Sequence, residues 1–177
     1  MNLTYRDRGK ARDEIVEQIA EHQDALQYMV TLQTKLKPAA TIDLIQDKVM
    51  NLSAEFRHFQ NRLNYELFGS RTSRKPKSFC VLSVPIIEGF DKSAYGFHTL
   101  HYHVALGNIP EHVSQDALET WIKDAWRRTK YGKSDVNLKV VRDDHKTYIT
   151  KEVLKNEGCG IDWLNLSIPI LTLQPQS

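Results

Sequence analysis

The chain has little cysteine and no long hydrophobic segment. Two cysteines in 177 residues, Cys80 and Cys159, are too few for a disulfide scaffold, and we expect both to be reduced thiols, with Cys80 buried. The longest apolar run, residues 79–87, is too short to cross a bilayer, and the polar amino terminus does not resemble a signal peptide. With 41% hydrophobic and 26% charged residues, the composition is that of a soluble protein. The sequence therefore predicts one cytoplasmic domain over residues 1–177, with no membrane partner.

A strong net charge is also lacking, since the formal value is only +2. Basic residues nevertheless gather in two short segments that contain almost no acids. Phosphate binding depends on local positive potential, so these segments are candidates for contact with a nucleic acid. A solvated loop and the end of a helix would show the same charges, and charge alone favours neither interpretation. The candidate DNA contacts are Arg71, Arg74, Lys75, Lys77, Arg127, Arg128 and Lys130.

Hydrophobic periodicity predicts both strands and helices. Strands are predicted at residues 26–35, 79–88, 97–106 and 136–141. Apolar residues three and four apart predict a long helix from about Thr41 to Gly69 and a second helix capped by Ser114. The order from residue 26 to 142 is β-α-β-β-α-β, which is the split βαβ, or ferredoxin-like, arrangement. The predicted fold class is therefore α+β: an antiparallel sheet with helices on one face and an open second face.

Three segments flank this unit. A polar helix is predicted at residues 10–24, a helix from about 143 to 156, and an edge strand or docked tail at 163–173. In the helix after Ser114, the spacing favours Trp121 as a core residue. Trp126 and Tyr131 lie among the basic residues and could stack on bases.

Two histidines stand two apart in the third predicted strand. His101 and His103 share one face, while Leu100, Tyr102 and the following apolar residues form the other. Because the apolar face fills the core, the histidines are left for the open face. Two imidazoles placed in this way can share one divalent metal ion.

A third ligand is expected, because two imidazoles alone hold hard divalent metals loosely. We favour Glu88 at the end of the preceding strand, with Asp91 as the competitor. Pro85 is expected to distort that strand, so alternation does not decide where Glu88 points. Mixed imidazole and carboxylate ligands suit Mn²⁺ or Mg²⁺.

Tyr148 precedes Lys151 by one helical turn in the last predicted helix. Ile149 and Val153 form the buried side of this helix, so the tyrosine is presented outward. A phenol is a poor nucleophile at neutral pH, and a neighbouring ammonium favours its ionised form. A surface tyrosine stacked on a lysine stem is the simpler interpretation, and only the upstream histidines favour chemistry.

Together these residues resemble the HUH endonuclease superfamily, which is named for its His-hydrophobic-His motif. Within it they look most like the single-tyrosine rolling-circle replication initiators (Rep proteins) of plasmids and single-stranded DNA phages. Residues 30–34 look like its "TLT"-type motif, residues 87–89 and 100–106 like its metal motif, and residues 148–151 like its Tyr-x-x-Lys. The resemblance covers roughly residues 26–156.

The resemblance implies a ferredoxin-like sheet and a metal-dependent enzyme that nicks and joins single-stranded DNA at an origin, often within a hairpin. Glu88, His101 and His103 would hold Mn²⁺ or Mg²⁺. Tyr148 would attack the scissile phosphate, leaving a 5′-phosphotyrosine and a free 3′-OH, while Lys151 balances charge. The chain has no room for a helicase, so a host helicase and polymerase are implied partners.

This chain departs from some relatives at Glu152, where they carry a second tyrosine. A single-tyrosine enzyme needs another nucleophile, a second protomer in a homodimer, or a second round of attack. Three alternatives remain: a transposase or relaxase of the same superfamily, a DNA-binding or regulatory module without catalysis, and a structural zinc site that uses Cys80 or Cys159.

Overall fold

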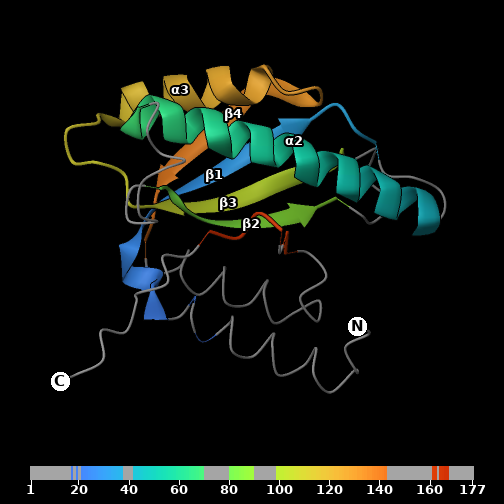
Figure 1. The fold of residues 1–177 in the computed structure, drawn as a ribbon, viewed down its shortest axis with the longest axis horizontal. Helices are drawn as coiled ribbons and strands as arrows, with labels where there is room; N and C mark the ends of the chain where they lie inside the picture. Colours follow the sequence, from blue (N-terminus) through green and yellow to red (C-terminus); the bar gives the residue numbers. More distant parts are fainter. Residues whose placement is uncertain are drawn as a thin grey trace.

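The computed structural model describes residues 17, 19, 21–37, 42–69, 80–89, 99–142, 161–162 and 164–167. In order, the elements are the 3-10 turn η1 (Gln23–Ala25), β1 (Leu26–Thr34), α2 (Ile42–Phe68), β2 (Leu82–Glu88), β3 (His101–Gly107), α3 (Gln115–Arg127) and β4 (Gly132–Val140). The strands form one antiparallel sheet in the order β2-β3-β1-β4, and α2 and α3 lie side by side on one of its faces (Figure 1). The fold class is α+β. None of the helices in these ranges is long and apolar enough to cross a membrane.

Residue chemistry accounts for the end of α2 and for the start of α3. Gly69 ends α2 with a φ of +80°, a backbone conformation that favours glycine, and its amide donates to the carbonyl of Tyr65. Ser114 caps α3, since its side-chain oxygen accepts from the amide of Ala117 at 3.2 Å. The buried stripe of α2 contains Leu52, Phe56, Phe59, Leu63 and Leu67.

Of the tryptophans of α3, Trp126 rather than Trp121 is the fully buried one, although Trp121 also packs against the core. Trp126 is fully buried, and its indole nitrogen donates to the carbonyl of Gln33 at 2.7 Å, so it does not stack on bases. Trp121 is only half-buried. The reason is helical spacing: Leu118, Ile122 and Trp126 follow one another every four residues along the face that meets the sheet, and Trp121 lies on the flank.

Strand β2 is regular, contrary to the distortion expected at Pro85. Its pairing with β3 continues without a register shift from Leu82 to Glu88. The carbonyl of Pro85 accepts from the amide of Asp162, on the side of β2 away from β3. An N–H at position 85 would point away from β3. Because proline lacks only this group, the β2–β3 pairing loses no hydrogen bond.

The described residues 161–162 and 164–167 contact this outer side of β2. Ile161 bridges to Ile86 and Ser167 to Ser83, which agrees in part with the predicted docked tail. Most of residues 10–24, residues 143–160 and the tail beyond 167 lie outside the described residues.

The sheet separates two hydrophobic clusters. The larger lies between the sheet and the helices and contains Tyr102, Phe56 and Trp126. The smaller lies on the other face, at the end of the sheet where Leu82 pairs with Gly107, and includes Val84 and Ile161. Cys80, just before β2, is a half-buried free thiol rather than the buried one expected.

Candidate metal centre

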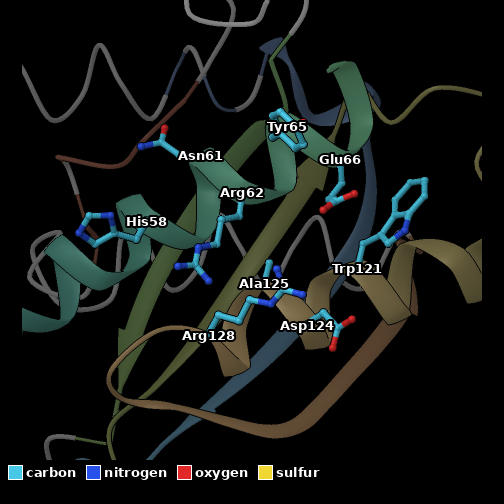
Figure 2. A pocket seen from close by; sticks show the side chains of 9 residues that line it. All are labelled: His58, Asn61, Arg62, Tyr65, Glu66, Trp121, Asp124, Ala125 and Arg128. Carbon is cyan, nitrogen blue, oxygen red and sulfur yellow. The ribbon is translucent and has the colours of Figure 1, made fainter. Parts of the chain in front are cut away.

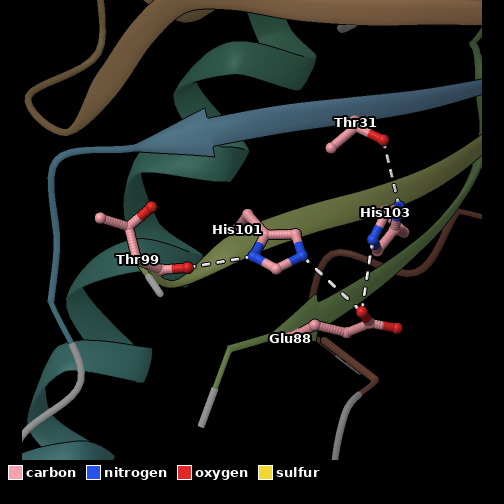
Figure 3. Close-up of polar contacts among 5 residues, drawn as sticks. All are labelled: Thr31, Glu88, Thr99, His101 and His103. Carbon is pink, nitrogen blue, oxygen red and sulfur yellow. Dashed lines mark hydrogen bonds and ion pairs between the residues drawn. The ribbon is translucent and has the colours of Figure 1, made fainter. Parts of the chain in front are cut away.

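Glu88, His101 and His103 come together on neighbouring strands β2 and β3. Glu88 pairs with His101, so their side chains project from the same face, and His103 follows two residues along β3. Nε2 of His101 lies 3.7 Å, and Nε2 of His103 3.3 Å, from the same Oε2 atom of Glu88 (Figure 3). One ligand atom from each residue lies within 4.8 Å of the others, so this triad could hold a metal ion.

Each imidazole is oriented through its other ring nitrogen. Nδ1 of His101 lies 3.0 Å from the carbonyl oxygen of Thr99. Because a carbonyl only accepts hydrogen bonds, Nδ1 carries the proton and the neutral ring keeps a lone pair on Nε2, toward Glu88. Nδ1 of His103 lies 3.2 Å from Oγ1 of Thr31 on β1 (Figure 3). Contacts of this kind fix the ring orientation of metal-binding histidines.

The electrostatics of the triad also suit a cation. When the ring of His101 is protonated, Nε2 donates to the Glu88 carboxylate, and this raises the pKa of His101; burial opposes the rise, while the Thr99 carbonyl and the charge of Glu88 add to it. A divalent ion would use the same Nε2 lone pair and neutralise the same carboxylate that favour the proton here. The side chains of His101, His103 and Glu88 are 19%, 23% and 29% exposed, respectively, so the site can be reached from solvent. Two imidazoles and one carboxylate fit a divalent metal with coordination positions left for a substrate.

Gly89 permits this arrangement at the end of β2. Its φ is +94°, and a Cβ atom there would lie 2.6 Å from the carbonyl oxygen of Thr99 and 3.3 Å from Nδ1 of His101. A side chain at position 89 would therefore push against the contact that orients His101. Gly89 was predicted only as part of the segment that looks like the metal motif, residues 87–89, and no role was predicted for Thr99.

Thr31 was also missed as an individual residue, although it lies inside the segment that looks like the "TLT" motif. A strand register placing Thr31 opposite His103 would have revealed its role, but register is not visible in one sequence.

The remaining predicted residues fall into two groups. Tyr148, Lys151, Asp91 and the basic residues Arg71, Arg74, Lys75 and Lys77 lie outside the described residues, so their placement stays a prediction. Arg127, Arg128 and Lys130 lie at the end of α3 and in the turn before β4. This turn is at the same end of the sheet as the triad, because Thr34 pairs with Gly132 and its neighbour Gln33 pairs with His101.

Arg128 lines a pocket of about 350 Å³ between α2 and α3 (Figure 2), and none of Glu88, His101 and His103 lines it. Arg62 and Trp121 line the same pocket. Arg127 is paired instead with Asp124 at 3.1 Å, and Lys130 lies over the ring of Tyr131. The structure therefore does not bring these cations into contact with the triad.

The tyrosines at positions 28, 65, 102 and 131 are described, and all four lie on the helix side of the sheet, in the larger cluster or in the pocket. Tyr102, between the two histidines, is fully buried. Its burial and the nearby Asp162 raise its pKa well above the ordinary value, so it stays protonated and unreactive.

A zinc site that uses Cys80 does not agree with the structure. Cys80 precedes β2, whereas Glu88 ends it, and the strand between them is about 20 Å long. Cys159 lies outside the described residues.

Comparison with protein-family models, with curated proteins and with solved structures found no match to this chain. The function is therefore argued from the residues and their arrangement.

Proposed function

We propose that this protein is a metal-dependent enzyme that nicks and joins single-stranded DNA through a tyrosine, as in the HUH replication initiators it resembles. The observation that carries the proposal is the convergence of Nε2 of His101 and Nε2 of His103 on one oxygen of Glu88. Both rings are held through Nδ1, which leaves the Nε2 atoms for an ion.

We also propose that the frame is a split βαβ fold with the metal site on its open face. The observed element order, the strand order β2-β3-β1-β4 and the position of both helices on one face support this assignment. Tyr102 points into the helix-side cluster, and the histidines on either side of it point the other way.

Chain connectivity supports Tyr148 as the nucleophile. β4 lies at one edge of the sheet, and residues 161–167 contact β2 at the opposite edge, about 14 Å away across three strand spacings. Residues 143–160, which include Tyr148 and Lys151, connect these edges. We propose that Tyr148 meets the triad on the face opposite α2 and α3, where no described helix lies.

The proposed reaction is a transesterification. The Tyr148 oxygen attacks phosphorus, the bond to the 3′ oxygen breaks, the phenolic proton is lost and the 3′ oxygen gains a proton, for which Lys151 is the proposed donor. Mn²⁺ or Mg²⁺ held by Glu88, His101 and His103 would supply Lewis acidity at the scissile phosphate. No water is consumed, so the free 3′-OH can reverse the step and rejoin the strand.

A covalent-adduct assay tests this function. The protein is incubated with Mn²⁺ and single-stranded DNA that includes hairpins, and denaturing electrophoresis is used to detect a slower-migrating protein band. We expect a band in the wild type that disappears with EDTA, with His103→Ala and with Tyr148→Phe, whereas Tyr65→Phe on the helix side retains it. A band that survives Tyr148→Phe would contradict the assignment of the nucleophile. DNA binding without any adduct would favour the non-catalytic binding module.

A further inference from the structure

A buried carboxylate, Asp162, lies at the centre of a hydrogen-bond network beneath the metal-binding strands. It is 5% exposed. Its Oδ1 accepts from the hydroxyl of Ser53 on α2 at 2.7 Å. Its Oδ2 accepts from the hydroxyl of Tyr102 and from the amide of Asn165, both at 2.7 Å. Three neutral donors thus converge on one buried acid, which is a costly arrangement to leave incomplete.

Tyr102 links this network to the metal centre. It is the residue between His101 and His103, and its ring is packed against Phe56 at 4.5 Å and Trp126 at 6.1 Å between centroids. The packing limits the position of the ring, and the bond to Asp162 fixes its hydroxyl. Because the pleat of a strand sets the directions of neighbouring side chains together, fixing Tyr102 also fixes the two imidazoles on the opposite face.

Asp162 is tied to the other ligand-bearing strand as well. Its backbone amide donates to the carbonyl of Pro85 at 3.0 Å, and the adjacent Ile161 bridges to Ile86. Ile86 is paired with His103 and is two residues from Glu88. The same residue therefore contacts β2 through its main chain and β3 through its side chain.

We propose that Asp162 is a positioning residue for the metal centre: by holding Tyr102 and the outer side of β2 together, docking of residues 161–167 sets the spacing between Glu88 and the two histidines. The inference rests on the proposed metal site and adds that a segment away from the ligands controls its affinity. A preorganised triad binds an ion without the loss of freedom that a mobile one would suffer.

The test measures Mn²⁺ affinity by isothermal titration calorimetry together with the thermal midpoint. Tyr102→Phe removes only the hydroxyl bound to Asp162, and Asp162→Ala removes the carboxylate that accepts all three hydrogen bonds. Gln27→Leu is the matched control, because the Gln27 side chain bonds the backbone of Ile109 at the end of the sheet away from the triad. We expect Tyr102→Phe to weaken Mn²⁺ binding about tenfold and Asp162→Ala at least as much. Gln27→Leu should lower the thermal midpoint while keeping the wild-type affinity.

The outcomes separate the two claims. A wild type that binds no Mn²⁺ overturns the metal site and this inference together. If the wild type binds but Tyr102→Phe binds equally well, only the positioning role is overturned. Equal weakening by Tyr102→Phe and Gln27→Leu also overturns it, because general loss of packing would then explain the effect. Should Asp162→Ala fail to fold, Tyr102→Phe still decides.

Discussion

Gly89 leaves no room for a side chain beside the candidate metal centre. It follows the ligand Glu88, has a φ of +94°, and brings its backbone against the carbonyl of Thr99, which in turn orients His101. Two independent costs would accompany any side chain here, namely a left-handed backbone and a clash with a main-chain oxygen. The clash occurs at the Thr99 carbonyl oxygen, which orients the ring of His101. A side chain at position 89 should therefore affect both the backbone and metal binding.

We predict that Gly89→Ala lowers both stability and Mn²⁺ affinity. The expected loss in the free energy of unfolding is about 2–5 kcal/mol, from strain and overpacking together. Gly69→Ala is the matched control: its φ is +80°, but nothing lies within 4 Å of the added Cβ, so only the backbone strain of about 1–2 kcal/mol should remain. Urea denaturation and calorimetry measure both quantities. Equal Mn²⁺ affinity in the two variants would contradict the role given to Gly89.

At the scale of residues, the sequence predicts the candidate metal ligands but not the contacts that orient them. His101 and His103 follow from strand alternation, and Glu88 was a choice over Asp91 that alternation did not settle. The structure brings Glu88 to the histidines because β2 remains regular through Pro85. The Thr99 carbonyl was not predictable, since main-chain oxygens carry no residue signature.

At the scale of elements, the β2–β3 hairpin and the position of α3 determine the site. β3 lies between β2 and β1, so its histidines receive Glu88 from one neighbour and Thr31 from the other. Helical spacing in α3 then places Trp126 against the opposite side of the sheet, where its ring meets Tyr102. The sequence predicted the existence and order of these elements. It did not identify Trp126 as the more deeply buried of the two tryptophans. Neighbouring faces of one helix are separated by only part of a turn, so spacing alone distinguishes them poorly.

We predict that Trp126→Ala and Trp121→Ala differ strongly in stability. Removing the fully buried indole of Trp126 leaves a cavity and takes away the hydrogen bond to the carbonyl of Gln33, and should cost about 3–5 kcal/mol of unfolding free energy. Trp121 is half-buried on the helix flank, and its removal should cost about 1 kcal/mol. Chemical denaturation followed by circular dichroism compares them. A larger loss for Trp121→Ala would show that the α3 face is assigned incorrectly.

For the whole molecule, the two faces of one sheet have different roles. One face carries α2, α3 and the larger cluster. The other carries the smaller cluster at the Leu82 end, and we propose that it also carries the triad at the Glu88 end. The α+β class and the antiparallel sheet were predictable, because each strand and helix has its own periodicity. The docking of residues 161–167 on β2 was predictable only as an edge strand or tail, since Asp162 acts through contacts distant in sequence.

Anomalous X-ray diffraction from crystals grown with Mn²⁺ tests the central claim most directly. We predict a strong peak about 2.0–2.3 Å from Oε2 of Glu88 and from Nε2 of both His101 and His103, and its loss in crystals of His103→Ala. A peak at other residues, or none at this triad at saturating Mn²⁺, would contradict the metal centre and the nicking reaction proposed from it.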